Sequence, residues 1–158
     1  SSGSGRSTWA SSAPFMRYLL DTNVLSEFVS VHPVARVTEW LGAQEPRDLA
    51  ASVMSLGEVE RGVVRLGDGA RRRRLVTWLR RDLPAQFGER IIDVNGAVAL
   101  AWGRLMTEGQ AAGRPLPVVD GLIIATAQVH GLTLVTRNTS DCAGRGVPTL
   151  DPWAWEPA

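Results

Sequence analysis

The sequence predicts an α/β fold in which a parallel sheet is covered by helices, and three observations support this class. Short apolar runs with the character of buried strands alternate with helical patterns along the chain, as expected for strands joined by helical crossovers. The stretch 118–127 is apolar nearly all round, which is typical of a helix buried in a core. Asp21 directly follows one apolar run, at the edge where open α/β sheets bind ligands. The strand candidates are 17–20, 48–52, 91–94, 132–136 and 147–150.

The segments between these strands predict helices from their apolar spacing. Apolar residues recur at helical intervals in 22–30, 33–41, 55–66, 70–83 and 97–106. Pro33 can open the second of these helices, and Gly109 or Gly113 ends the last. Gly131 ends the apolar helix, and residues 137–141 after the fourth strand read as a polar loop. The order of elements therefore favours one doubly covered sheet.

The helix at 70–83 is rich in arginine. Leu75, Val76 and Leu79 form its inner face, with Trp78 only partly buried, and Pro84 is expected to end it. Clustered arginines can bind phosphate backbones, although a solvated helix face is the simpler interpretation of such a run. The arginines of this segment are 71–74, 80 and 81.

Length and composition indicate one domain without disulfides. A chain of 158 residues can bury a sizeable core, and Cys142 has no second cysteine to pair with. Residues 1–15 are rich in serine and glycine, so we interpret them as a flexible tail or tag and assign 16–158 to the domain. No apolar run approaches the roughly 20 residues of a membrane span, and we expect a soluble, cytoplasmic protein.

Four carboxylates stand at the junctions of apolar elements. Asp21 ends the first strand, Glu58 follows the second, Asp120 opens the buried helix and Asp141 follows the fourth strand. A parallel sheet would bring Asp21 and Asp141 to one edge, and the two helical residues can reach it as well. Crowded carboxylates repel one another unless a cation is bound, and oxygen ligands favour Mg²⁺ or Mn²⁺ over zinc. Such an ion supports in-line cleavage of a phosphodiester, so the pattern indicates a metal-dependent nuclease.

Each carboxylate also has a purely structural interpretation. Ser55 and Glu58 match a capping box, in which the glutamate bonds back to the start of its own helix. Asp120 would be favoured by the positive end of a helix dipole, and Asp141 can be an ordinary turn residue. Asp21 is the hardest to explain in this way because its strand neighbours are apolar. Only the joint placement of the four favours a site.

Other catalytic motifs are missing from the sequence. It contains no Walker phosphate loop, no G-x-G-x-x-G after the first strand and no G-x-S-x-G elbow. His32 precedes a proline in a loop, and His130 lies at the far end of the buried helix from Asp120, so neither is assigned a role.

The sequence resembles the PIN-domain nucleases, in particular the VapC and FitB type toxins of bacterial toxin–antitoxin pairs. Four ordered motifs carry the resemblance, and the chain also ends similarly, with Asp-Pro-Trp at 151–153. The motifs are L-L-D-T-N-V-L-S-E at 19–27, S-L-G-E at 55–58, D-G-L-I-I-A-T-A at 120–127 and V-T-R-N at 135–138. The resemblance runs from about Met16 to Trp153.

This resemblance implies a three-layer PIN fold, with a five-stranded parallel sheet in the order 3-2-1-4-5 and helices on both faces. It implies that Asp21, Glu58 and Asp120 bind Mg²⁺ or Mn²⁺ and activate the water that attacks RNA. Thr22 and Asn23 would support the site from their loop, and Thr136 from the fourth strand.

The fourth ligand is left open by the resemblance. Some relatives have an aspartate two residues after the strand-four threonine, where this chain has Asn138 and then Asp141. Asn138 offers a neutral oxygen, whereas Asp141 offers a charged one, so we include Asp141 among the catalytic and metal-binding candidates and Asn138 among the supporting residues. RNA contacts are assigned to Arg72 and Arg73 from charge clustering, and to Arg137.

The resemblance also implies partners. Similarity to toxins of this type implies a homodimer that a small cognate antitoxin inhibits by placing a basic side chain in the acidic pocket. It also implies that DNA is bound only through the antitoxin. A catalytically weak nucleic-acid-binding PIN module is the alternative function, favoured by Asn138 and the arginine run. A phospho-acceptor domain would also place an aspartate beside Mg²⁺, but it needs a lysine, and this chain contains none.

Overall fold

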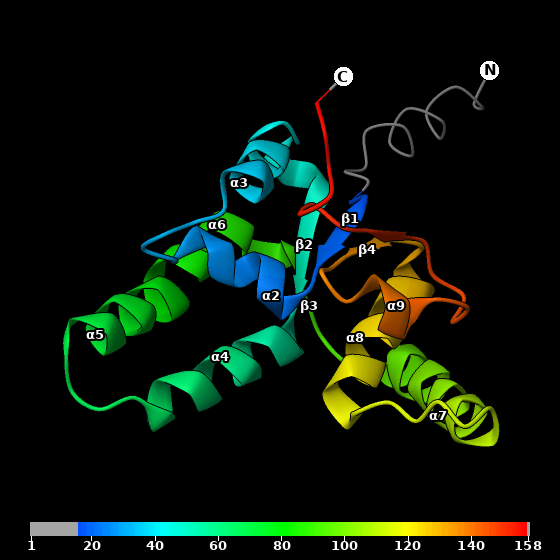
Figure 1. Cartoon of the computed structure of the whole chain (residues 1–158). Coiled ribbons are helices and arrows are strands. Elements are labelled where there is room, and N and C mark those ends of the chain that lie inside the picture. The colour runs from blue at the N-terminus through cyan, green and yellow to red at the C-terminus, as the bar shows by residue number, and fades with distance from the viewer. Residues whose placement is uncertain (1–15, 158) are drawn as a thin grey trace, which may run out of the picture.

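The computed structural model describes residues 16–157, so the interpretation of residues 1–15 as a tail lies outside the described part of the chain. Five parallel strands form one sheet in the order β3-β2-β1-β4-β5, which confirms the expected topology. The strands are β1 (Tyr18–Leu20), β2 (Leu49–Ser52), β3 (Ile91–Ile92), β4 (Thr133–Val135) and β5 (Thr149–Leu150). The central position of β1 in Figure 1 places its carboxyl end in the middle of the sheet edge.

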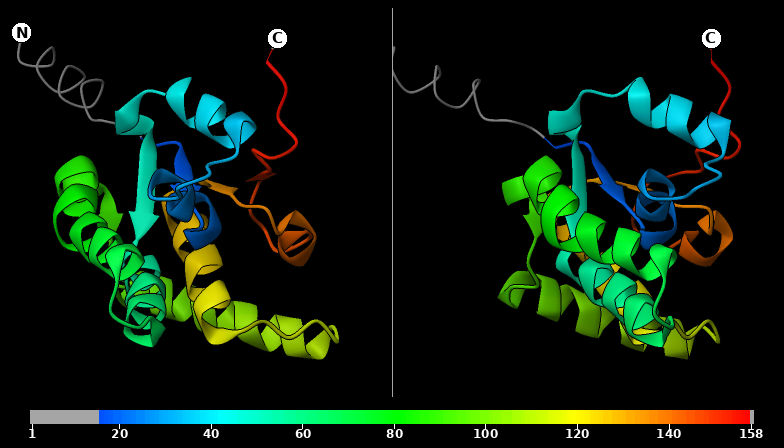
Figure 2. Two further views of the ribbon diagram at one scale, coloured as in Figure 1. Left: turned by 60° about the vertical axis from the view of Figure 1, so that its left-hand side comes forward. Right: turned by 90° about the vertical axis from the view of Figure 1, so that its left-hand side faces the viewer.

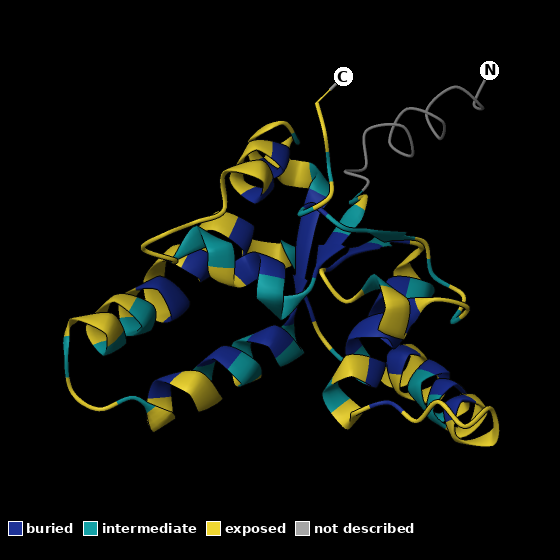
Figure 3. Cartoon of the chain, in the orientation of Figure 1, coloured by how far each residue is buried: buried dark blue, intermediate teal, exposed yellow. Residues whose placement is uncertain are grey.

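Successive strand residues face opposite sides of the sheet and start two separate cores. Leu19 and Ala50 pack in one apolar cluster, whereas Leu20 and Val135 pack in the other. All four side chains are fully buried, and in Figure 3 the strands at the centre of the sheet are largely dark blue. A sheet covered on both faces is typical of parallel α/β proteins.

Helices cover both faces, as predicted (Figure 1 and Figure 2). The face of Leu20 packs against helices from the first half of the chain, and the face of Leu19 packs against those from the second half. The first group is α2 (Thr22–Leu25), α3 (Ala35–Gly42), α4 (Val53–Arg65), α5 (Ala70–Thr77) and α6 (Leu83–Phe87), and the second is α7 (Gly96–Ala111), α8 (Val118–His130) and α9 (Thr139–Cys142). No helix within residues 16–157 is long and apolar enough to cross a membrane.

Several predicted boundaries are wrong, and one of them bears on Glu58. Helix α4 begins at Val53, and Ser52 caps it by accepting a hydrogen bond from the Met54 backbone at 3.0 Å. Ser55 is therefore not a helix cap, and the capping-box interpretation of Glu58 is excluded. The side chain of Glu58 instead accepts a hydrogen bond from the Thr22 hydroxyl.

The arginine-rich helix continues beyond its predicted end. Helix α5 runs through a π-helical turn, Trp78–Asp82, directly into α6, and Pro84 lies in the first turn of α6. Proline is tolerated there because the first backbone amides of a helix need no partner within that helix. Trp78 is 5% exposed and belongs to the core, so its predicted partial burial is wrong.

Two shorter segments also differ from expectation. The predicted helix 22–30 is one turn, α2, followed by a 3₁₀ turn at Ser26–Phe28. The predicted polar loop 137–141 contains the short helix α9, which carries Asp141. Gly131 ends α8 as expected, in the left-handed conformation (φ 66°) that glycine adopts without strain.

Candidate active site

Asp21 is positioned by the register between β1 and β4. Because Leu20 pairs with Val135, the residues that follow these strands, Asp21 and Thr136, lie side by side. The Thr136 hydroxyl donates to Asp21 Oδ2 at 2.7 Å, and the Thr22 backbone amide donates to Asp21 Oδ1 at 2.8 Å. Asp21 therefore caps α2, and both of its carboxylate oxygens are held in fixed directions.

Thr136 links Asp21 to its neighbours. It is 0% exposed, and its hydroxyl accepts from the Asn138 backbone amide at 3.0 Å and from Asn23 Nδ2 at 3.4 Å. Asn23 Oδ1 is buried and has no hydrogen-bond partner within residues 16–157, so an acceptor oxygen is left available at this edge. The predicted supporting residues Asn23, Thr136 and Asn138 thus form one group around Asp21.

Replacing Thr136 by valine is expected to lower the free energy of unfolding by about 1–3 kcal/mol, because the shape is kept while the donor to Asp21 Oδ2 is lost and two donors lose their acceptor. Chemical denaturation of Thr136→Val beside Thr136→Ser measures this effect, since serine keeps the hydroxyl. Equal stability of the two variants would show that the hydrogen bonds of Thr136 contribute nothing.

Glu58 reaches the site through Thr22. The Thr22 hydroxyl lies 2.6 Å from Glu58 Oε1 and 2.8 Å from the buried Ser55 hydroxyl. A hydroxyl has one proton, so Thr22 donates to the charged Glu58 and accepts from Ser55. Asp21 and Glu58 are therefore linked through Thr22, the residue that follows Asp21. The sequence predicted Ser55 only as a helix cap, so its contact with Thr22 was missed.

Asp120, Asn138 and Asp141 complete the edge from the other side. Together with Asp21 they line a small cavity of about 20 Å³, which also touches Cys142. A volume of that size holds about one water molecule or one small ion. The alternative ligands Asn138 and Asp141 are both present at this cavity, whereas Glu58 lines a separate, larger pocket.

Asp120 lies in the electrostatic field of the other three predicted carboxylates. Partial withdrawal from water raises the pKa of Asp120 above its usual value, and three neighbouring carboxylates raise it further. These neighbours are Asp21, Glu58 and Asp141. The negative charge of Asp120 is therefore destabilised by its neighbours, and a bound cation would relieve this.

Cys142 contributes no soft ligand to this cavity. Burial, and then the surrounding carboxylates, raise the pKa of its thiol to about 11, so the thiol remains protonated at neutral pH. Only a thiolate is a strong metal ligand, and the donors left are oxygens of the kind that Mg²⁺ and Mn²⁺ prefer. The chemistry of the donor set therefore fits these ions.

The side chains are not closed around an ion. Within residues 16–157, no three acidic, histidine or cysteine side chains are gathered closely enough to hold a metal as they stand. Because the carboxylates repel one another, coordination requires them to turn toward a cation that offsets their charge. The site is thus an open arrangement of oxygen donors.

Two arginines fix the segment that carries Asp141. Arg114 donates to the carbonyls of Ala143 at 2.8 Å and Ser140 at 3.2 Å. Arg145 donates to the Asp141 carbonyl at 2.7 Å and to the Arg114 carbonyl at 3.0 Å. These bonds tie α9 to the loop before α8, so the position of Asp141 depends on hydrogen bonds from two arginine side chains to backbone carbonyls.

Gly109 provides the space for this connection. A Cβ atom there would lie 2.8 Å from the Arg114 carbonyl oxygen and 3.1 Å from Arg145 Nη1, and backbone cannot move aside cheaply. Gly109→Ala is therefore expected to destabilise the protein by about 1–3 kcal/mol. Gly103→Ala in the same helix is the matched control, because a Cβ there meets nothing within 4 Å, and alanine should stabilise the helix by up to about 1 kcal/mol. Thermal denaturation with similar midpoints for both variants would contradict this role of Gly109.

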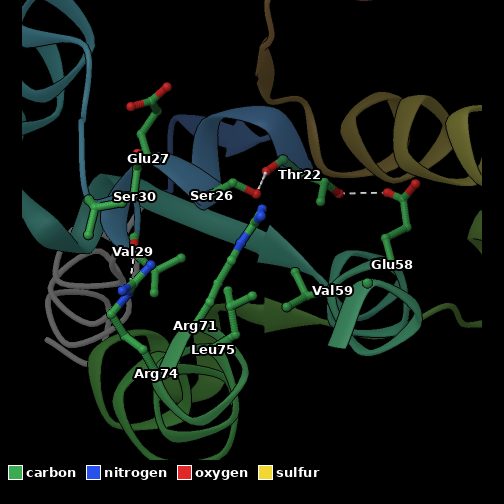
Figure 4. Close-up of a pocket in the computed structure, with 12 residues that line it drawn as sticks. Thr22, Ser26, Glu27, Val29, Ser30, Glu58, Val59, Arg71, Arg74 and Leu75 are labelled. Atoms are coloured by element: carbon green, nitrogen blue, oxygen red, sulfur yellow. Dashed lines mark hydrogen bonds between the residues drawn. The ribbon is translucent and has the colours of Figure 1, made fainter. Parts of the chain in front are cut away.

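A second, larger pocket of about 460 Å³ lies beside the carboxylates, and Thr22 and Glu58 are among the residues that line it. Arg71 and Arg74 line its opposite wall (Figure 4). From the sequence, both belong to the arginine run 71–74, but RNA contacts within that run were assigned to Arg72 and Arg73. Helical spacing does not separate these two arginines from Arg72, which lies three residues before Leu75 and so also flanks the inner face.

The arginines that the sequence assigned to RNA lie differently. Arg72 pairs with Asp68 at 3.3 Å, and Arg73 is exposed and does not line the pocket of Glu58. Arg137 lies over the Trp153 ring, with its guanidinium carbon 5.1 Å from the ring centroid. These positions do not test RNA binding by the three residues, which remains a prediction.

Comparison with known proteins identifies relatives of this chain. The PIN domain family model matches residues 18–140. VapC ribonuclease Y4jK of Sinorhizobium fredii is 30% identical over 140 residues, which cover 89% of this chain and 99% of the relative.

Two solved structures are similar over most of their length. FitAB bound to the IR36 DNA fragment has a TM-score of 0.81 at 30% identity, covering 89% of this chain and 98% of that one. A toxin–antitoxin complex from Klebsiella pneumoniae has a TM-score of 0.60 at 29% identity, covering 85% and 97%.

The family match includes the strand that precedes Asp21, the helices that carry Glu58 and Asp120, and Thr136 with Asn138. The structural similarity extends over the same five-stranded sheet and its helices. The chain therefore belongs to the PIN domain family.

Proposed function

We propose that this protein is a metal-dependent endoribonuclease that acts as a toxin and is inhibited by a cognate antitoxin. The observation that carries the proposal is the small cavity at the centre of the carboxyl edge, where Asp21, Asp120 and Asp141 meet. Ribonuclease activity is supported by the VapC ribonuclease relative, of which this chain covers 99% at 30% identity.

The acidic residues of the edge would hold Mg²⁺ or Mn²⁺, with Asp21 and Asp120 in the small cavity, Asp141 or Asn138 beside them, and Glu58 approaching from α4. When bound, such an ion lowers the pKa of water and neutralises charge on a phosphodiester. Thr136 and the α2 backbone amide keep the carboxylate of Asp21 in one orientation. Thr22 orients Glu58 in the same way, because its hydroxyl donates a hydrogen bond to Glu58 Oε1.

An antitoxin is the partner that the similarity supports. The relatives include a toxin–antitoxin complex and a FitAB structure bound to DNA. We infer that an antitoxin covers the acidic edge of this chain, that DNA is bound through that antitoxin, and that the toxin acts as a homodimer in the bacterial cytoplasm. A basic side chain would be attracted to the acidic cavity for the same reason as a cation.

RNA cleavage with controlled metal content tests the proposal. The purified chain is expected to cut RNA in Mg²⁺, to lose that activity in EDTA, and to regain it when Mn²⁺ is added in excess. The alternative function, a catalytically weak PIN module, predicts RNA binding in EDTA and no products with either ion. Cleavage that continues unchanged in EDTA would contradict metal dependence while leaving ribonuclease activity in place.

A further inference from the structure

We propose that Arg71 and Arg74 form a subsite for a phosphate of single-stranded RNA next to the bond that is cut. This inference rests on the proposed ribonuclease function and adds the residues that hold the substrate. It also replaces Arg72 and Arg73 as the main RNA-binding arginines of this helix.

The pocket in Figure 4 lies beside the catalytic candidates. Thr22, which lines it, directly follows Asp21 and donates to Glu58, which lines it too. Its volume of about 460 Å³ falls within the range of roughly 300–1,000 Å³ that is usual for ligand pockets. A nucleotide held in this pocket would therefore lie next to the phosphodiester that is cut at the carboxylates.

Arg71 is available to a ligand. Its guanidinium makes no hydrogen bond or ion pair with another residue in the range 16–157, although Glu27 and Glu58 line the same pocket. Both acids already accept hydrogen bonds, Glu27 from the Val34 backbone amide at 3.0 Å and Glu58 from Thr22 at 2.6 Å. In Figure 4 the Arg71 side chain extends toward Ser26 and Thr22.

Arg74 adds a second charge to the same wall and is partly fixed. Its Nε donates to the Val29 carbonyl at 3.3 Å, which leaves the terminal nitrogens of the guanidinium for a ligand. Arg71 and Arg74 are three residues apart on α5, so they lie on one face of the helix. By contrast, Arg72 is directed to Asp68.

The charge balance of the site favours a phosphate over other groups. RNA is repelled by the carboxylates at the edge, so its binding requires positive charge nearby. The planar guanidinium of arginine binds phosphate oxygens through two parallel hydrogen bonds, and hydroxyls of Ser26 and Ser30 line the same pocket. Two arginines facing a nuclease centre are thus suited to a phosphodiester backbone.

Equilibrium binding of a labelled single-stranded oligoribonucleotide of mixed sequence tests this subsite, in the full chain with Asp21→Asn so that RNA stays intact. Adding Arg71→Ala and Arg74→Ala should raise the Kd by about tenfold. It should also reduce the slope of log Kd against log salt by about 1.4, since each contact to a single strand contributes about 0.7. Lysine at both positions should restore the salt slope.

Two control pairs remove the same number of charges. Arg47→Ala with Arg104→Ala, both exposed and outside the pocket, should leave the Kd within about twofold of the parent. Arg72→Ala with Arg73→Ala compares the other arginines of the same helix. The inference is overturned if this pair carries the effect, or if the Arg71 and Arg74 pair changes neither Kd nor slope. The pocket would then be left to another occupant, such as an acidic segment of an antitoxin.

A cleavage assay separates this inference from the proposed function. In the chain with Asp21 intact, Arg71→Ala and Arg74→Ala should raise the KM for RNA by about tenfold and leave kcat nearly unchanged. If the parent cleaves RNA and the variant has the same KM as the parent, the subsite is refuted and the nuclease function is not. A parent that binds RNA through these arginines but never cleaves it refutes the nuclease function alone.

Discussion

Asp21→Asn is expected to reduce RNA cleavage by at least about a hundredfold while the protein stays folded. Even residues that only orient metal ligands typically cost 10–100-fold when replaced, and Asp21 is a proposed ligand itself. Asparagine keeps an oxygen that can cap α2 through the Thr22 amide, and asparagine and aspartate are about equally good caps. The loss therefore reflects the charge of the carboxylate.

Asp93→Asn is the matched control, because Asp93 directly follows β3 at the same edge of the sheet but lies two strands from β1. Initial rates of cleavage under saturating Mg²⁺ compare the two variants, and circular dichroism verifies the fold. The assignment of Asp21 is wrong if both variants cut RNA as fast as the parent, or if both are equally impaired.

Leu83→Ala is expected to lower the free energy of unfolding by about 2–5 kcal/mol. Leu83 is 0% exposed and packs in the core on the face of Leu20, at the point where the π-helical turn passes into α6. Removing its side chain leaves a cavity that the neighbouring helices cannot fill completely, so the transfer and cavity costs add. Urea denaturation of the full chain measures the difference.

Leu100→Ala makes the same chemical change at a position that is 69% exposed on α7. Substitutions of exposed residues usually stay within about 0.5 kcal/mol, so the midpoint of this variant should remain close to that of the parent. Comparable losses from the two leucines would mean that Leu83 lies outside the core, and that the helical segment from Ala70 to Phe87 packs differently.

The strands and the central carboxylate could be predicted because they depend on local patterns. Each strand is a short, mostly apolar run that ends at a polar residue or just before one, and the carboxyl ends of parallel strands meet by topology alone. Asp21 was identified on that basis, and the register of Leu20 with Val135 explains why Thr136 is its neighbour. The position of Asp120 in the first turn of a buried helix was equally visible in the sequence.

The start of α4 could not be predicted because two serines compete for the cap. Ser52 and Ser55 are both suitable capping residues, and Ser55 with Glu58 matches the better-known sequence pattern. Burial does not decide the choice, because both serines are 0% exposed; their partners do, since Ser52 accepts from the Met54 amide and Ser55 contacts Thr22 across the site. The role of Glu58 therefore depends on a contact between residues 36 positions apart.

The helical segment around Pro84 was missed for a different reason. Proline ends a helix only when its position needs a backbone donor, and the π-helical turn before Leu83 removes that need. The distinction between Arg71 and Arg72 depends on the same helix, because its rotation against α2 and α4 decides which arginines face Glu58. Such rotations are set by packing, which a single sequence does not display.

A crystal structure of the chain soaked in Mn²⁺ tests most directly whether the acidic edge is a metal-dependent active site. An anomalous peak is expected in the cavity of Asp21 and Asp120, with carboxylate oxygens turned in to within about 2.2 Å of the ion. The same map identifies whether Asn138 or Asp141 is the further ligand. A fully soaked crystal with no peak at this edge, or with its only peak elsewhere, would contradict the proposed active site.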